Sequence, residues 1–143
     1  MRTQEIKNNE KKQRLWVVFT GQTDLRWVFW LKRGFRHCFV VMHNGSCWVS
    51  LDPLASHIEV MVQDIPADFD LPQWLKSQGH EVMEASPARH DRPAPVMPLT
   101  CVEFVKRILG VHKRFIFTPW QLYRYLQSGS SMVHQDIHYN KGE

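Results

Sequence analysis

The 143-residue sequence contains no apolar run long enough to cross a bilayer, and its start lacks the apolar stretch of a signal peptide. It has only three cysteines, an odd and widely spaced set that makes a poor disulfide framework. The phosphate-binding P-loop and GxGxxG motifs and the GxSxG motif are missing as well. These absences favour a cytoplasmic location, although proteins of the phage type reach the cell wall by other routes than a signal peptide. The cysteine pattern is compatible with one reactive thiol.

The composition is that of an ordinary globular protein, with 43% hydrophobic and 22% charged residues. A chain of this length suits one domain, which we expect over residues 15–127. Residues 1–14 are basic and almost without apolar side chains, so they indicate a flexible tail, and residues 128–143 indicate a loose C-terminal tail. The net charge of +4 permits an anionic partner without requiring one.

Hydrophobic periodicity and turn residues predict an α+β fold in which an antiparallel β-meander packs against the helix that carries Cys101. Four prolines between residues 86 and 98 predict a loop before that helix. The predicted strands are 15–20, 36–43, 46–52, 57–63 and 80–85, and the predicted helices are 23–33, 72–77, 101–109 and 119–127.

A histidine and an aspartate are predicted to meet across one hairpin. Asn44-Gly45 is the strongest short hairpin signal, and a two-residue loop there pairs His37 with Asp52. Directly opposed side chains have Cβ atoms about 5 Å apart, which is hydrogen-bonding reach for an imidazole and a carboxylate. A carboxylate beside a histidine fixes the ring tautomer, although a polar surface pair would have the same spacing.

A cysteine is predicted at the first position of a helix. Thr100-Cys101-Val102-Glu103 reads as a capping box in which Glu103 reaches back to Thr100, and Gly110 supplies a helix stop. The positive end of a helix favours thiolate over thiol, and its N–H groups can bind an oxyanion. The same pattern also fits a cysteine that merely packs beneath a helix end.

The motifs around His37 (Arg36-His37-Cys38-Phe39-Val40-Val41), Asp52 (Trp48-Val49-Ser50-Leu51-Asp52) and Cys101 (Thr100-Cys101-Val102-Glu103-Phe104) resemble those of the circularly permuted papain-like proteins of the NlpC/P60 superfamily. In that group, which includes the lecithin:retinol acyltransferase-like enzymes, the histidine hairpin precedes the cysteine helix. The resemblance covers roughly residues 35–110. It implies a papain-like fold and a cysteine peptidase, amidase or acyltransferase without a cofactor, acting on a peptide, amide or ester.

By position, the resemblance implies that Cys101 is the nucleophile, His37 the general base and Asp52 the residue that orients it. The backbone N–H of Cys101 would be one oxyanion donor, and Gln22 is the only side chain that suggests itself as a second. The sequence departs from the family pattern at Cys38, where a small residue usually follows the histidine.

Three other interpretations remain open at this stage. A member of the fold without activity would act as a binding or scaffold module. Basic clusters at Lys32, Arg33 and Arg36 and at Lys106, Arg107, Lys113 and Arg114 would suit a nucleic-acid surface, although cations are also expected at a helix end. A zinc site formed by His37, Cys38, His43 and Cys47 lacks the usual CxxC spacing, and its side chains would point apart.

Overall fold

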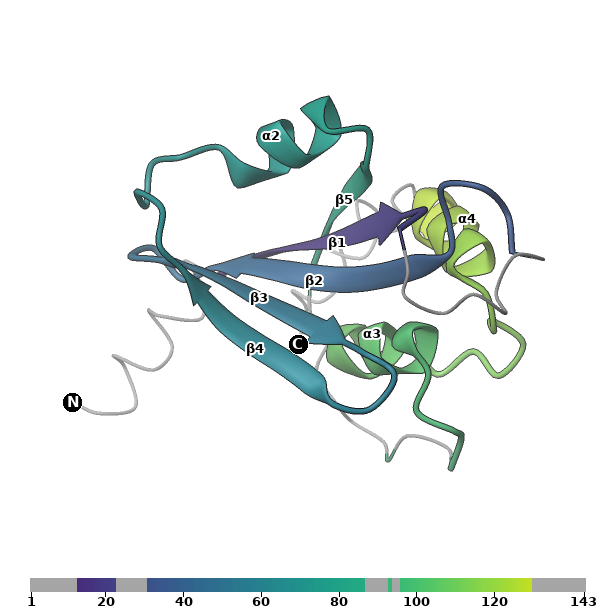
Figure 1. Ribbon diagram of the computed structural model, residues 1–143. Helices are drawn as coiled ribbons and strands as arrows, with labels where there is room; N and C mark the ends of the chain where they lie inside the picture. The colour runs from purple at the N-terminus through teal and green to yellow at the C-terminus, as the bar shows by residue number, and fades with distance from the viewer. Residues whose placement is uncertain (1–12, 23–30, 87–92, 94–95, 130–143) are drawn as a thin grey trace, which may run out of the picture.

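The computed structural model describes residues 13–22, 31–86, 93 and 96–129. Within these ranges lie five strands and three helices (Figure 1). The strands are β1 (Arg14–Thr20), β2 (His37–His43), β3 (Trp48–Pro53), β4 (Ile58–Gln63) and β5 (Glu81–Ala85), and the helices are α2 (Leu71–Ser77), α3 (Cys101–Leu109) and α4 (Pro119–Gly129).

The strands form one antiparallel sheet in the order β4-β3-β2-β1-β5. The consecutive strands β2, β3 and β4 form the predicted meander, and β1 joins its far side by pairing with β2. The last strand, β5, pairs with β1 and makes the opposite edge of the sheet. The fold is therefore α+β with an antiparallel five-stranded sheet, which confirms the predicted α+β class.

One face of the sheet is covered by the two C-terminal helices, α3 and α4 (Figure 1). Side chains at alternate positions of β1 and β2 point to this face, because successive residues of a strand face opposite sides. They pack against the apolar stripe of α3 and against Leu122 of α4. The buried residues of this main core are Leu15, Val17, Phe19, Phe35, Cys38, Val40, Val102, Val105, Leu109 and Leu122.

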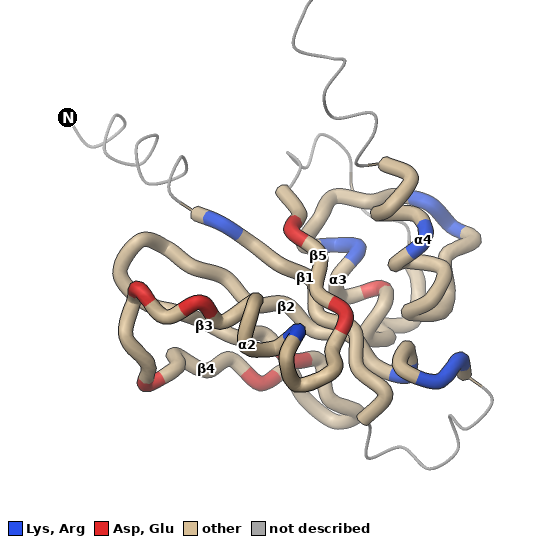
Figure 2. The backbone as a smooth tube through the Cα atoms, turned by 90° about the horizontal axis from the view of Figure 1, so that it is seen from above, with Lys and Arg blue, Asp and Glu red and all other residues tan. Residues whose placement is uncertain are grey.

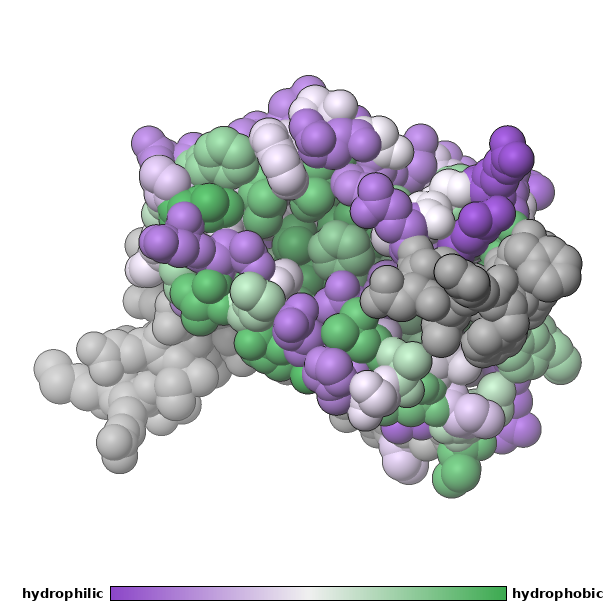
Figure 3. Space-filling model, in the orientation of Figure 1, coloured by the Kyte–Doolittle hydropathy of each residue, from purple (hydrophilic) through white to green (hydrophobic). Residues whose placement is uncertain are grey.

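The opposite face carries a smaller core under the short helix α2. Its buried residues come from the other set of alternate positions: Trp16, Val18, Val41, Trp48, Leu71, Leu75 and Val82. The space-filling view has apolar side chains in a hollow between α2 and the sheet (Figure 3). Both faces of the sheet are thus used, but the longer helices and the larger core are on the Cys101 side.

The register of the β2–β3 hairpin differs from the prediction. His43 pairs with Trp48, not with Ser46, so residues 44–47 form a four-residue loop. The side-chain oxygen of Asn44 accepts hydrogen bonds from the backbone N–H groups of Ser46 and Cys47, both at 2.9 Å. This local turn is the alternative that an asparagine offers to a two-residue hairpin loop, and it moves the pairing by two residues.

The predicted helix at 23–33 falls mostly outside the described residues, as do most of the two predicted tails at 1–14 and 128–143. No helix in the described ranges is long and apolar enough to span a membrane.

Candidate active site

His37 and Asp52 are in direct contact at one end of the sheet. The Nε2 atom of His37 lies 2.6 Å from Oδ1 of Asp52, a short distance typical of a charge-assisted hydrogen bond. Their side chains are 15% and 27% exposed, so the pair is partly shielded from water. Since Nε2 is used by the carboxylate, Nδ1 is the ring nitrogen left to face another group.

The contact does not arise from direct cross-strand pairing. The β2–β3 ladder stops at Val40 and Leu51, so the last residues of both strands at this end are unpaired with each other. In the observed register His37 and Asp52 are diagonal neighbours, and a shift of two residues leaves each side chain on its original face.

Cys101 is the first residue of α3, which runs from Cys101 to Leu109, as the sequence predicts. The hydroxyl of Thr100 accepts a hydrogen bond from the backbone N–H of Glu103 at 3.2 Å, and Gly110 ends the helix with a φ of 66°. The helix contacts both β2 and β3. Its partly exposed first residue therefore comes against the unpaired end of the hairpin.

The predicted capping box is only half formed. The Glu103 side chain turns into the protein, where Oε2 accepts a hydrogen bond from the Lys106 ammonium at 2.9 Å and Oε1 pairs with Arg107 at 3.4 Å. Lys106 is 1% exposed and also donates to the Ile116 carbonyl at 3.5 Å. Two cations stabilise a carboxylate more than one N–H group does. Their charges also offset the negative charge of Glu103, which would otherwise add to that of a Cys101 thiolate at the start of α3.

The pKa values of Cys101 and His37 are shifted in opposite directions. Hydrogen bonding with Cys38 and with His37 lowers the pKa of Cys101 to about 5, although burial acts to raise it. Burial acts to lower the pKa of His37, but hydrogen bonds to Asp52 and Cys101 raise it to about 9. Between these values the thiolate and the imidazolium form an ion pair, each stabilising the charged form of the other.

Cys38 is the residue of this cluster that the sequence reasoning missed. It lies two residues before Val40 on β2, so both side chains point to the face covered by α3, and it is 0% exposed. Burial raises the pKa of its thiol well above the ordinary value, which keeps the thiol protonated beside Cys101. The available signal was alternation from the apolar Val40, which assigns Cys38 to the same face of β2.

The remaining predicted groups are placed differently. The exposed Gln22 follows the end of β1, and its backbone N–H donates to the Thr20 hydroxyl at 3.0 Å, but no contact joins its side chain to Cys101. Of the second basic cluster, Lys106 is buried in the ion pair with Glu103 and does not belong to a surface patch, which corrects that reading. Basic residues occur on and between α3 and α4 but also on β1 and α2, and acidic residues occur on β3, β4, β5 and α3 (Figure 2).

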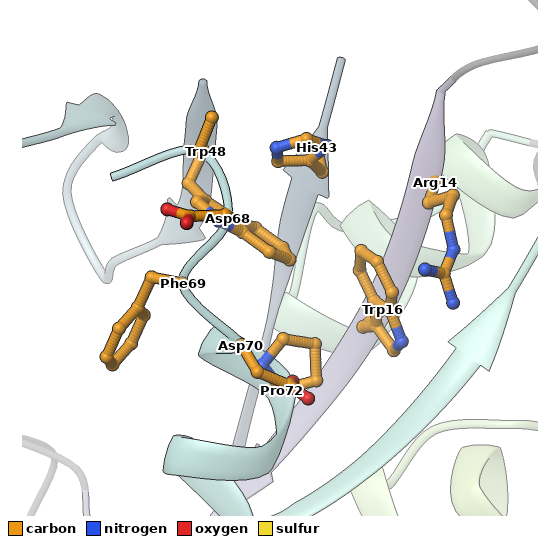
Figure 4. Close-up of a pocket in the computed structure, with 9 residues that line it drawn as sticks. Arg14, Trp16, His43, Trp48, Asp68, Phe69, Asp70 and Pro72 are labelled. Atoms are coloured by element: carbon orange, nitrogen blue, oxygen red, sulfur yellow. The ribbon is translucent and has the colours of Figure 1, made fainter. Parts of the chain in front are cut away.

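A cavity of about 320 Å³ lies at the other end of β2, on the face covered by α2 (Figure 4). It is lined mainly by aromatic and acidic side chains: Trp16, Trp48, Phe69, Asp68 and Asp70, with Arg14 and His43. The Nε2 atom of His43 and the Nε1 atom of Trp48 are buried without a hydrogen-bond partner. His43 therefore belongs to this region, and Cys47 lies in the hairpin loop, so neither is part of the Cys101 cluster.

Among the described residues, no group of three histidine, cysteine, aspartate or glutamate side chains is arranged to hold a metal ion. No family model, no curated protein and no solved structure matches the chain.

Proposed function

We propose that the protein is a thiol-dependent hydrolase or acyl-transfer enzyme with a papain-like fold of the permuted NlpC/P60 type. Cys101 is the nucleophile, His37 the acid–base group and Asp52 the residue that orients His37. The observation that carries the proposal is that one imidazole is held by a carboxylate at 2.6 Å and interacts with a thiol at the first position of a helix. Nucleophilic cysteines are activated by this combination of groups.

The chemistry follows from the positions of these groups. The Cys101 thiolate attacks the carbonyl carbon of an amide or ester, and the carbonyl electron pair moves to the oxygen. That oxyanion is stabilised by N–H groups of the first turn of α3, which have no acceptors within the helix. The His37 imidazolium then donates its proton to the leaving nitrogen or oxygen as the C–N or C–O bond breaks, and a thioester remains on Cys101.

In the second half of the reaction, neutral His37 takes a proton from water or from another acceptor, which attacks the thioester. The acyl group leaves Cys101 as an acid or as a new ester or amide, and the thiolate–imidazolium pair is restored. Asp52 keeps Nε2 of His37 engaged throughout, so that Nδ1 always serves Cys101. The substrate is a peptide, amide or ester, and the proposed enzyme requires no metal or organic cofactor for these steps.

The proposal is tested by acylation with an activated ester such as p-nitrophenyl acetate, followed by mass spectrometry of the protein. We expect an acyl adduct on Cys101 and a burst of p-nitrophenol in the wild-type protein. Replacing Cys101 by Ala should remove both, and a panel of peptide amides and esters should then lose turnover by about 10⁴-fold or more. Cys47→Ala is the matched control, because Cys47 is a free thiol of similar partial exposure outside the site.

Acylation of Cys47 in preference to Cys101, or an unchanged burst in the Cys101→Ala variant, would contradict the proposed function. A protein without any acylation at Cys101 would instead be a non-catalytic module of this fold.

A further inference from the structure

The connection between α3 and α4 exposes two phenylalanines. Phe115 is 83% exposed and Phe117 is 56% exposed, although burying an aromatic ring is among the largest gains that folding offers to a side chain. The half-buried Ile116 between them packs against the main core. This connection lies at the outer edge of the molecule, so the two rings are presented to whatever the protein meets there (Figure 1).

The segment that carries the exposed rings is fixed by hydrogen bonds. The Ile116 carbonyl accepts a hydrogen bond from the buried Lys106 ammonium at 3.5 Å. The side-chain oxygen of Gln121 accepts from the backbone N–H groups of Phe117 at 2.9 Å and Thr118 at 3.1 Å. A partner that covers the rings therefore binds a backbone that is already ordered, which reduces the entropy lost on binding.

The same connection is cationic. Lys113 and Arg114 directly precede Phe115, and both are exposed. From residue 104 to residue 129 the sequence has five Lys and Arg residues and no Asp or Glu. Two of the five belong to the ion pairs of Glu103, and the other three are exposed (Figure 2). Exposed apolar rings beside exposed cations are complementary to a surface with an apolar interior and anionic headgroups.

We propose that the connection between α3 and α4 docks the protein on an anionic lipid bilayer. Phe115 and Phe117 insert at the boundary between headgroups and acyl chains, and Lys113 and Arg114 pair with lipid phosphates. A single-stranded nucleic acid also binds basic and aromatic side chains, but it follows a positively charged groove, whereas these rings project from an outer edge (Figure 1). The inference is independent of the proposed function, because it uses no residue of the Cys101 cluster.

The test is sedimentation of the full chain with two kinds of lipid vesicle, at about 0.1 M salt so that surface charges are only partly screened. One kind contains three parts phosphatidylcholine to one part phosphatidylglycerol, and the other contains phosphatidylcholine alone. The double variant Phe115→Ser with Phe117→Ser removes the rings and leaves the net charge unchanged. The matched control is Trp74→Ser, because Trp74 is an aromatic residue with 48% exposure on α2, at the opposite face of the sheet.

We expect the wild-type protein to bind the anionic vesicles and to show little binding to phosphatidylcholine alone. The Phe115→Ser, Phe117→Ser variant should bind the anionic vesicles about tenfold more weakly or less, because the rings no longer leave water. Lys113→Gln with Arg114→Gln should lose a similar factor through the lost attraction to phosphates. Trp74→Ser should bind as the wild type does, and thermal unfolding checks that each variant keeps its fold.

Four results would overturn the inference. The first is a wild-type protein that does not bind the anionic vesicles, and the second is full binding by the Phe115→Ser, Phe117→Ser variant, which would attribute the attraction to net charge alone. The third is an equal loss in Trp74→Ser. The fourth is a different occupant of the two rings: tighter retention of an oligothymidylate, or a self-association seen by analytical ultracentrifugation, that the phenylalanine substitutions abolish.

Discussion

The helices α3 and α4 begin with the same sequence pattern, a threonine followed three residues later by Glu or Gln, yet the two helix starts are built differently. At α4 the box is complete: the Gln121 side-chain oxygen accepts from the N–H groups of Phe117 and Thr118, and the Thr118 hydroxyl accepts from Gln121. At α3 the Thr100 hydroxyl accepts a hydrogen bond from the N–H of Glu103, but the Glu103 carboxylate is turned inward to Lys106 and Arg107. At α3 the backbone N–H of Thr100 donates instead to the Pro98 carbonyl at 3.0 Å, and this start without a side-chain acceptor for the N-cap N–H is called the open helix start below.

The two helix starts also differ in the residue at the first helical position. Pro119 occupies the first position of α4, where it has no N–H to satisfy and no reactive group. Cys101 occupies the same position in α3, with His37 and Cys38 against it. Because Glu103 is neutralised by Lys106 and Arg107 away from the helix start, its charge does not oppose ionisation of Cys101.

The variant with the largest expected effect on the difference between the two helix starts is one that lowers the free energy of unfolding. Glu103→Ala leaves the buried Lys106 ammonium without its carboxylate, and we expect a loss of about 3–5 kcal/mol in the free energy of unfolding. Gln121→Ala, at the matched position of α4, should cost about 1 kcal/mol because it removes exposed capping bonds. Urea unfolding of the two variants measures both values.

The control for this prediction is the double variant Glu103→Gln with Lys106→Met, which removes both charges and should recover much of the stability that Glu103→Ala loses. Equal losses in Glu103→Ala and Gln121→Ala would mean that the inward ion pair is not what distinguishes the two helix starts.

A smaller effect concerns the histidine that faces Cys101 at the open helix start. Asp52→Asn removes the carboxylate that helps to raise the pKa of His37 to about 9, so we expect the imidazolium to lose its proton about one pH unit lower. An NMR titration of the His37 ring protons measures this change, with His43 as an internal control at the far end of β2. No shift at His37, or an equal shift at His43, would argue against the Asp52 contact as the cause.

The smallest expected effect is one that the two helix starts share. Thr100→Ala and Thr118→Ala each remove a hydroxyl that accepts one backbone N–H at 3.2 Å. Each should lower the free energy of unfolding by about 1 kcal/mol, and the two losses should agree within about 0.5 kcal/mol. A much larger loss at Thr100 would show that the open helix start depends on this cap more heavily than the geometry indicates.

The parts of the fold that the sequence predicted well are those with local signals. The cap at Thr100 and the stop at Gly110 define α3 to the residue, and strand alternation assigns each side chain of β2 to a face. The hairpin register was wrong because Asn44 bonds to its own loop rather than forming a two-residue turn, a choice that depends on competing local hydrogen bonds.

The site itself was predictable only in pieces. His37 and Asp52 still meet because an error of two residues preserves the face of each side chain, whereas an error of one would have separated them. The direction of the Glu103 side chain and the burial of Lys106 depend on what α3 packs against, which a capping pattern does not contain. The proximity of Cys38 and Cys101 likewise follows from packing between two distant segments.

The most direct test of the account is the pH dependence of Cys101 alkylation by iodoacetamide in the Cys47→Ala protein. The account predicts that the rate rises with a midpoint near pH 5, because the thiolate forms there as a partner of the His37 imidazolium. In His37→Ala the midpoint should move toward that of an ordinary thiol, about 8.5. A wild-type midpoint already near that ordinary value, unchanged by His37→Ala, would contradict the claim that these residues form an activated thiol site.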